Sequence, residues 1–184
     1  MKAGDIILVR GNGWFARRIL DVATELDNGE LAVVSHVGMF LCERHVIEAL
    51  FHRGVVTSAY PQSFKDSEYV IASPKNITVF EREILALSAL TFSARSYGTY
   101  GIALQVLDYL FKTRWFSRHL DLGEDMCSFC SYVVAHAYST VNKFFGVDPA
   151  SAMPDDIWDF VIGNPDKYAI ETYTPGMEEW LTAK

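Results

Sequence analysis

Residues 32–51 read AVVSHVGMFLCERHVIEALF, and this stretch does most to decide the fold class. It holds two runs rich in Val, Ile and Phe, at 32–41 and 45–51, with a short polar connection between them. β-branched and aromatic residues favour strands, and two such runs joined by a short connection are typical of an antiparallel hairpin. We therefore predict two paired strands in this part of the chain.

The segments outside this hairpin predict further strands and several helices. Short runs of strand-forming residues occur at 5–10, 55–59, 69–72 and 168–173. Apolar residues recur at helical spacing at 14–24, 81–93, 102–115 and 128–145, with Gly146 suited to a helix end and Met153-Pro154 to a helix start. Strands come first, then helices, then a closing strand, which predicts an α+β fold in one domain over residues 1–184.

Composition narrows the class of protein. Of the 184 residues, 50% are hydrophobic and 21% are charged, as in ordinary globular domains. The net charge of -7 argues against a nucleic-acid partner, because nucleic-acid binding proteins cluster Lys and Arg against phosphates. The start, MKAGDIILVR, lacks an apolar signal-peptide core, and the run 102–111 is too short and too polar to cross a bilayer. These features predict a soluble, cytoplasmic protein without stable membrane insertion, and they leave its oligomeric state open.

Three Cys residues are too few, and odd in number, for a disulfide framework, so a chemical role for one of them is the better hypothesis. Cys130 falls in the first turn of the helix expected at 128–145, where free backbone N–H groups and the helix dipole lower the pKa of a thiol. It shares a helix face with Val133, Val134 and Ala137, so we expect it to point inward. On its own, an isolated buried Cys is better explained as a structural residue.

His36 is the candidate imidazole. Alternation places it in a strand that is apolar on both faces, so its ring needs a buried partner, and Glu48 is the only carboxylate of the next run. A direct pairing of His36 with Glu48 around the connection Leu41-Cys42-Glu43 would set their Cβ atoms about 5 Å apart. Such a carboxylate would orient the imidazole, as the third member of a catalytic triad does. The pair alone fits a structural role and a catalytic role equally well. Cys130 at a helix start makes the catalytic role the better hypothesis.

Six short motifs resemble one known family. In chain order they are Gly4-Asp5-Ile6-Ile7-Leu8, Ser35-His36-Val37-Gly38-Met39-Phe40, Val46-Ile47-Glu48-Ala49, Gly98-Thr99-Tyr100-Gly101, Cys130-Ser131-Tyr132-Val133-Val134 with Ala137-Tyr138, and Met153-Pro154-Asp155-Asp156. They are similar to motifs of the circularly permuted papain-like cysteine hydrolases of the NlpC superfamily, in the YiiX/YebB-like branch, with lecithin–retinol acyltransferase-like enzymes as more distant kin. The similarity runs from Gly4 to about Trp158. It departs from the family at Tyr132, where a Glu is common, which affects the expected substrate contacts more than the nucleophile.

The resemblance implies a permuted papain-like fold, in which an antiparallel sheet or small barrel packs against the helix that carries Cys130. It implies that Cys130 is the nucleophile, that His36 is the general base and then acid, and that Glu48 orients His36. The backbone N–H of Cys130 would form part of an oxyanion hole. Tyr100 would be a second donor or a substrate contact, or simply a packing residue.

The implied activity is that of a thiol-dependent hydrolase or acyltransferase, which cleaves an amide, ester or thioester through an acyl-enzyme. This class includes cysteine peptidases and amidases that act on peptidoglycan-type peptides. The resemblance implies no cofactor and no metal. The substrate would be a small molecule, a peptide or a lipid acyl group.

Three other hypotheses stay open at this point. Cys127-Ser128-Phe129-Cys130 is a Cys-x-x-Cys at a helix start, as in dithiol oxidoreductases, although this leaves His36 and Glu48 unexplained. A zinc site that uses both Cys residues lacks a second closely spaced pair of ligands. A non-catalytic binding module could keep the same cleft, and the basic aromatic stretch 111–118 could then rest on a lipid surface or simply end a helix.

Overall fold

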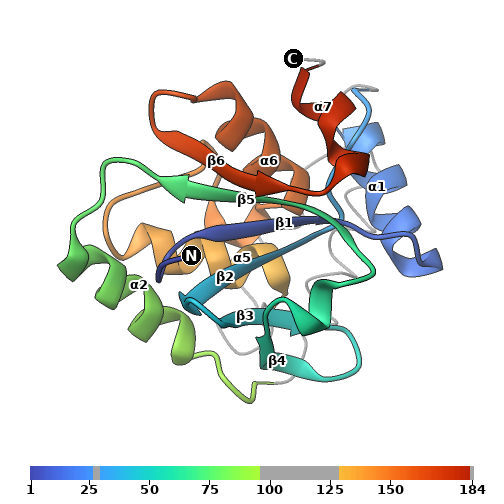
Figure 1. The fold of residues 1–184 in the computed structure, drawn as a ribbon. Coiled ribbons are helices and arrows are strands. Elements are labelled where there is room, and N and C mark those ends of the chain that lie inside the picture. The colour runs from blue at the N-terminus through green and yellow to red at the C-terminus, as the bar shows by residue number, and fades with distance from the viewer. Residues whose placement is uncertain (27–29, 96–128, 183–184) are drawn as a thin grey trace.

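The computed structural model describes residues 1–26, 30–95 and 129–182, and these form six strands and five α-helices (Figure 1). The strands are β1 (Ile6–Arg10), β2 (His36–Cys42), β3 (His45–Leu50), β4 (Gly54–Ala59), β5 (Glu68–Pro74) and β6 (Tyr168–Tyr173). The helices are α1 (Trp14–Leu26), α2 (Val79–Leu90), α5 (Cys130–Ser139), α6 (Pro154–Gly163) and α7 (Glu178–Thr182), with short 3-10 turns at Gln62–Phe64, Pro149–Ser151 and Pro175–Met177. The predicted α+β class is confirmed. None of the helices in these ranges combines the length and the hydropathy of a membrane-spanning helix.

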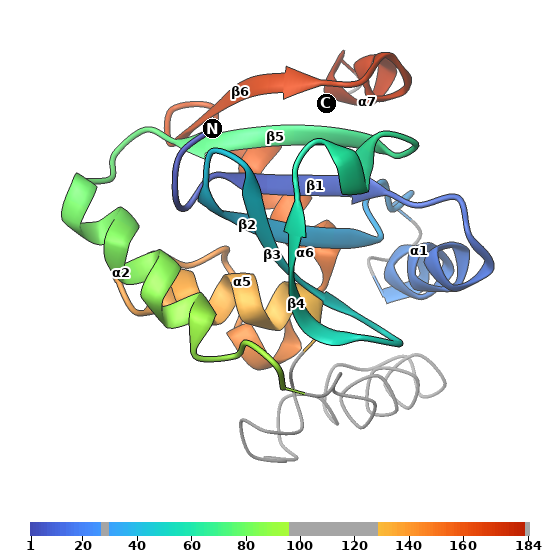
Figure 2. The same cartoon turned by 60° about the horizontal axis from the view of Figure 1, so that its bottom comes forward.

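The strands form one antiparallel sheet in the order β4-β3-β2-β1-β5-β6. Helices α2, α5 and α6 lie on the same side of this sheet (Figure 2). α5 packs against β2 and β3 and also contacts α2 and α6, so it is held between the sheet and two other helices. The main core lies between them and includes Leu8, Val37, Met39, Val133 and Trp158. A smaller core covers the other face of the sheet and includes Ile7, Phe40 and Val46.

Hydrogen bonds from two largely buried side chains connect α2 and α5 to the start of β1. The Tyr138 hydroxyl of α5 donates to the Gly4 carbonyl at 2.5 Å. Arg82 of α2 donates from Nη1 to Asp5 Oδ1 at 2.9 Å and to the Ala3 carbonyl at 2.6 Å. Because these groups are largely removed from water, the hydrogen bonds fix both helices relative to the sheet.

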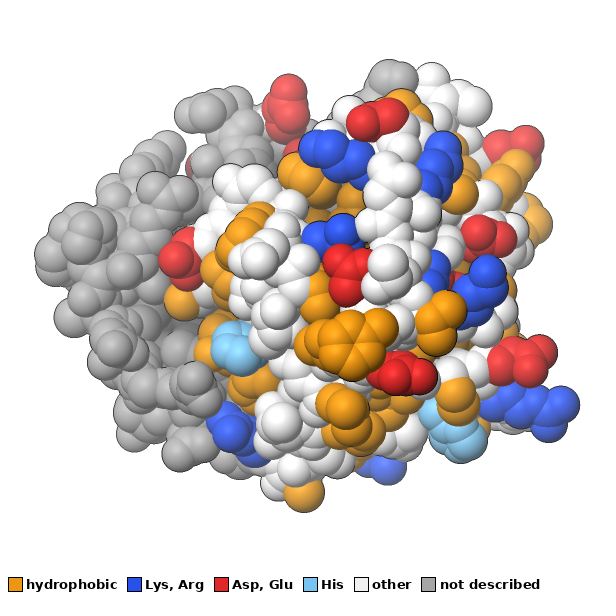
Figure 3. Space-filling model, turned by 90° about the vertical axis from the view of Figure 1, so that its left-hand side faces the viewer, with side chains coloured by type: hydrophobic (Ala, Val, Ile, Leu, Met, Phe, Trp, Pro, Cys, Tyr) orange, Lys and Arg blue, Asp and Glu red, His pale blue; other side chains and the backbone are white. Residues whose placement is uncertain are grey.

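The side of the molecule that carries α2 exposes hydrophobic side chains among charged ones (Figure 3). Val79, Phe80 and Leu87 of α2 are exposed, whereas Leu85 and Ala89 are fully buried. α2 is therefore attached to the core through one narrow stripe of its surface.

The strand predicted at 32–41 begins only at His36. The backbone N–H groups of Val33 and Val34 donate to the Asp155 carboxylate, at 2.7 and 2.9 Å, and not to a neighbouring strand. The carboxylate of a residue far along the chain therefore takes the place of the strand carbonyls as hydrogen-bond acceptor. The local sequence pattern cannot reveal this.

The helix predicted at 128–145 covers only Cys130–Ser139. It ends where the Lys143 N–H donates to the Tyr138 carbonyl at 3.1 Å and Asn142 adopts a positive φ of 54°. Asn142 therefore takes the left-handed position that the sequence predicts for Gly146, whose own φ of 79° lies in the following loop. The helix predicted at 102–115 lies outside the described residues.

Candidate active site

The side chains of His36 and Glu48 meet across the hairpin that β2 and β3 form. His36 is the first residue of β2, and Glu48 lies two residues before the end of β3. His36 Nε2 and Glu48 Oε2 are 2.7 Å apart, and the two side chains are 21% and 5% exposed. The predicted contact between an interior imidazole and this carboxylate is therefore present.

The register of the hairpin differs from the predicted one by two residues. Glu48 lies opposite Gly38, not opposite His36, and Phe40 lies opposite Val46, with an irregularity after Phe40 where the turn is tighter than expected. A shift of two residues leaves each side chain on its original face of the sheet. The diagonal pair still meets because long side chains bridge the larger separation.

Gly38 allows β2 and β3 to lie close together beside this pair. A Cβ atom at this position would be 2.7 Å from Val46 Cγ1 and 3.1 Å from the backbone oxygen of Ile47. Any side chain would therefore push the two strands apart, next to the residues whose side chains must touch.

Cys130 is the first residue of α5, as the sequence predicts, and only 4% of it is exposed. Phe129 precedes it as the N-cap residue and supplies no side-chain acceptor, so the first N–H groups of the helix stay available to other acceptors. The His36 side chain and the backbone N–H groups of Val37 and Ser131 lower the pKa of this thiol, so all three lie near the sulfur. Residues at the start of α5 and at the start of β2 therefore both act on Cys130.

One imidazole joins the thiol and the carboxylate. Since Nε2 of His36 contacts Glu48, Nδ1 is the ring nitrogen left for Cys130. The structure thus brings together Cys130, His36 and Glu48, the three residues for which the sequence predicts chemistry.

The charges in this group favour an ion pair. Burial alone would lower the pKa of His36, but the charge and hydrogen bond of Cys130, followed by those of Glu48, raise it to about 10. Burial alone would raise the pKa of Cys130, but the His36 imidazolium and the N–H groups of Val37 and Ser131 hold it below its ordinary value. A thiolate beside an imidazolium is therefore the favoured protonation state.

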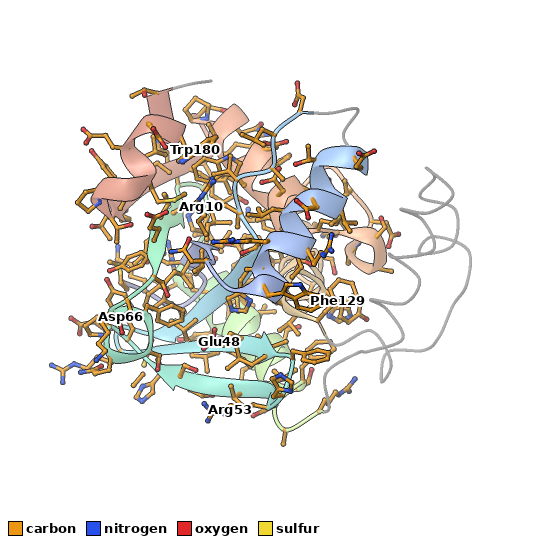
Figure 4. The ribbon with its side chains drawn as sticks, turned by 90° about the vertical axis from the view of Figure 1, so that its right-hand side faces the viewer. Arg10, Glu48, Arg53, Asp66, Phe129 and Trp180 are labelled. Atoms are coloured by element: carbon orange, nitrogen blue, oxygen red, sulfur yellow. The ribbon has the colours of Figure 1, made fainter. Side chains whose placement is uncertain are left out.

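Glu48 has two further neighbours that sequence reasoning missed. Burial alone would raise the pKa of Glu48, but the hydrogen bond and charge of His36, the hydrogen bond of Ser58 and the charge of Arg53 lower it. Ser58 is buried on β4, and Arg53 is exposed in the turn between β3 and β4. Figure 4 shows Arg53 below Glu48 in its view, with Phe129 above and to the right. Alternation along the predicted strand at 55–59 was the available signal for Ser58, since it shares a face with Glu48 once the register is known.

The chain segment that leads into His36 is fixed by residues that are distant in sequence. The Gly11 N–H donates to Ser35 Oγ at 2.9 Å, and the Asp155 carboxylate accepts from the N–H groups of Val33 and Val34. Sequence reasoning noted Asp155 only as part of a motif and gave it no role. Its contacts show that it holds the start of the His36 strand.

Of three further residues singled out by the sequence, one packs in the core and two lie outside the described residues. Tyr132, which stands where the resembled family commonly has Glu, is 6% exposed and packs edge-on against Phe92, with 5.6 Å between ring centroids. It belongs to an aromatic cluster of the core. Tyr100 and Cys127 lie outside the described residues, so the predictions about them stay predictions.

Within residues 1–26, 30–95 and 129–182, no group of three or more His, Cys, Asp and Glu side chains is arranged to hold a metal ion. Cys42 Sγ and His45 Nδ1 are 3.3 Å apart in an exposed position at the turn of the β2–β3 hairpin. A thiol and one imidazole make half of a typical zinc site.

Searches against protein-family models and against curated proteins found no match to this chain. The functional argument therefore depends on the fold and on the geometry of the site.

Proposed function

We propose that this chain is a thiol-dependent hydrolase or acyltransferase, with Cys130 as nucleophile, His36 as general base and acid, and Glu48 as the carboxylate that orients His36. One observation carries the proposal: the His36 imidazole lies 2.7 Å from a buried carboxylate and close enough to a buried thiol at a helix N-terminus for each of the two to shift the pKa of the other. A structural His–Glu pair has no need of the thiol, and a structural buried Cys has no need of the imidazole. A triad accounts for both contacts.

In this proposal the Cys130 thiolate attacks the carbonyl carbon of an amide, ester or thioester. The bond from that carbon to N, O or S breaks, and the His36 imidazolium gives its proton to the leaving group. The acyl group then stays on Cys130. Water, or an acceptor alcohol, amine or thiol in a transferase, attacks the acyl-enzyme while His36 takes its proton, and cleavage of the bond to sulfur restores the thiolate.

The first turn of α5 would stabilise the tetrahedral intermediate. Cys130 is the first residue of α5, so its backbone N–H lies at the helix N-terminus, where it would donate to the developing oxyanion. One donor of this kind contributes about 3 kcal/mol of transition-state stabilisation. The Ser131 N–H lowers the pKa of the Cys130 thiol and so stabilises the thiolate.

The finer fold assignment, a permuted papain-like domain of the NlpC type, belongs to the same proposal. It is supported by the order of the elements, in which a strand bearing His precedes a helix that starts at Cys and packs against an antiparallel sheet. The substrate would be an amide, including a peptidoglycan-type peptide, or a lipid ester or thioester, since all three classes react through the same tetrahedral chemistry.

Trapping of the acyl-enzyme tests the proposal directly. The protein would be incubated with a panel of activated esters, acyl thioesters and peptide amides, quenched in acid, and mapped by mass spectrometry. We expect the acyl adduct on Cys130, and turnover that is lost in Cys130→Ala and kept in the matched variant Cys42→Ala. Turnover that survives in Cys130→Ala, or an adduct confined to Cys42, would contradict the proposed nucleophile.

A further inference from the structure

Residues 152–155, which lead from the 3-10 turn Pro149–Ser151 into the first turn of α6, contact both parts of the candidate active site. This segment, called here the 152–155 clamp, touches α5 next to Cys130 and touches the chain just before His36.

On the α5 side, the Ser131 hydroxyl donates to the Ala152 carbonyl at 2.6 Å. Both residues are completely buried. Ser131 follows Cys130 directly, and its own N–H helps to lower the pKa of the Cys130 thiol. The hydroxyl of one residue therefore anchors the clamp at the helix turn that holds the nucleophile.

On the strand side, the Asp155 carboxylate accepts from the N–H groups of Val33 and Val34, at 2.7 and 2.9 Å, through a single oxygen. Asp155 is 4% exposed, and the two valines are 3% and 0% exposed. A buried carboxylate that accepts two backbone N–H groups forms strong, charge-assisted hydrogen bonds. The chain is therefore fixed two residues before His36.

The clamp between these two contacts is short and stiff. Pro154 fixes its own backbone φ angle at the first position of α6, and the Met153 N–H donates to Asp156 Oδ2 at 2.8 Å. A displacement at one end would therefore be transmitted to the other.

We infer that the 152–155 clamp sets the distance between Cys130 and His36, and that Asp155 and Ser131 are positioning residues for their reaction. The inference rests on the proposed function and names the contacts that would position its two reacting residues. The two reacting residues are each the first residue of their element, β2 and α5, and a displacement of about 1 Å between reacting groups lowers a rate by about 100-fold. A link between those ends is therefore of direct catalytic value.

The test measures the rate and pH dependence of Cys130 alkylation by iodoacetamide in Asp155→Asn and Ser131→Ala. Asn keeps the shape of Asp and an acceptor oxygen, so the fold should persist. We expect labelling of Cys130 in Asp155→Asn to be about tenfold slower at neutral pH. The pH at which its labelling rate rises should move up, towards the pKa of a free thiol. Asp148→Asn is a matched control, because Asp148 accepts from the Ala150 N–H at 2.8 Å and touches neither valine.

A second control separates positioning from stability. Val161→Ala removes buried methyl groups from α6 and should lower the thermal midpoint while Cys130 labelling stays as in the wild type. The double variant Ser131→Ala/Asp155→Asn should label within about threefold of the slower single variant, because both contacts serve one clamp.

The outcomes distinguish this inference from the proposed function. A wild type whose Cys130 reacts no faster than Cys42 would overturn both. A fast wild type with Asp155→Asn unchanged in rate and pH limb would overturn the inference alone. The inference alone would also be overturned if the rate losses of the two single variants multiplied in the double variant. The same holds if Val161→Ala lost as much Cys130 labelling as Asp155→Asn.

Discussion

Glu48→Gln tests how the buried carboxylate acts on the thiol. Gln keeps the size of Glu and an acceptor oxygen, so the 2.7 Å hydrogen bond to His36 Nε2 can persist in a neutral form. A hydrogen bond to an ionised group contributes about 1.5–3 kcal/mol and a neutral one about 0.5–1.5 kcal/mol. The imidazolium therefore loses about 1 to 1.5 kcal/mol of stabilisation, which makes the equilibrium constant for the thiolate–imidazolium pair about tenfold smaller.

The assay is the rate of iodoacetamide labelling at each Cys, measured by peptide mapping across the acidic and neutral pH range. We expect Cys130 to react faster than Cys42 in the wild type, although Cys42 is exposed and Cys130 is buried. In Glu48→Gln we expect the rise of Cys130 labelling with pH to move by about one unit to higher pH, and labelling at neutral pH to be slower by at most about tenfold. Glu43→Gln removes a carboxylate from the exposed hairpin turn and is the matched control. Equal Cys130 profiles in the wild type and Glu48→Gln, or an equal loss in Glu43→Gln, would refute this reasoning.

Three further outcomes follow from the structure. Gly38→Ala should destabilise the fold by about 1–3 kcal/mol in urea unfolding, because its Cβ would clash with β3; wild-type stability would argue against the close strand approach. Arg82→Met should cost about 3 kcal/mol in the same assay, because it leaves the Asp5 carboxylate buried without its 2.9 Å ion-pair partner; a neutral effect would mean that this ion pair is unimportant. The raised pKa of His36 gives stability that is lost as pH rises from 6.5 through about 10, and the lowered pKa of Cys130 gives stability that is lost as pH falls from 9.0. The difference in unfolding free energy between the wild type and Cys130→Ala should therefore be flat between about pH 6.5 and 9 and fall on either side, and a steady slope across that window would exclude the ion pair.

The α+β class and the residues of the candidate site could be predicted because they depend on local patterns. Alternation in the hairpin gives the face of His36 and Glu48, and the apolar spacing after Cys130 gives the inward face of its helix. A register error of two residues did not separate the pair, since only an odd shift moves a side chain to the other face.

The contacts that could not be predicted join residues far apart in sequence. The start of β2 depends on Asp155, which is 122 positions from Val33, and nothing near Val33 indicates that its N–H leaves the sheet. The end of α5 depends on which of two candidate residues, Asn142 or Gly146, takes the left-handed position, and the bond from Lys143 to the helix end decides it. Ser58 becomes a neighbour of Glu48 only after β4 has paired with β3.

The most direct measurement of the central claim is the ultraviolet absorbance of thiolate, taken as the difference between the wild type and Cys130→Ser during a pH titration. A buried thiol that shares a proton with His36 must already be ionised at neutral pH. We therefore expect the thiolate signal at neutral pH in the wild type and its loss there in His36→Ala. A signal that rises only near the pKa of a free thiol, and equally in both proteins, would contradict the account.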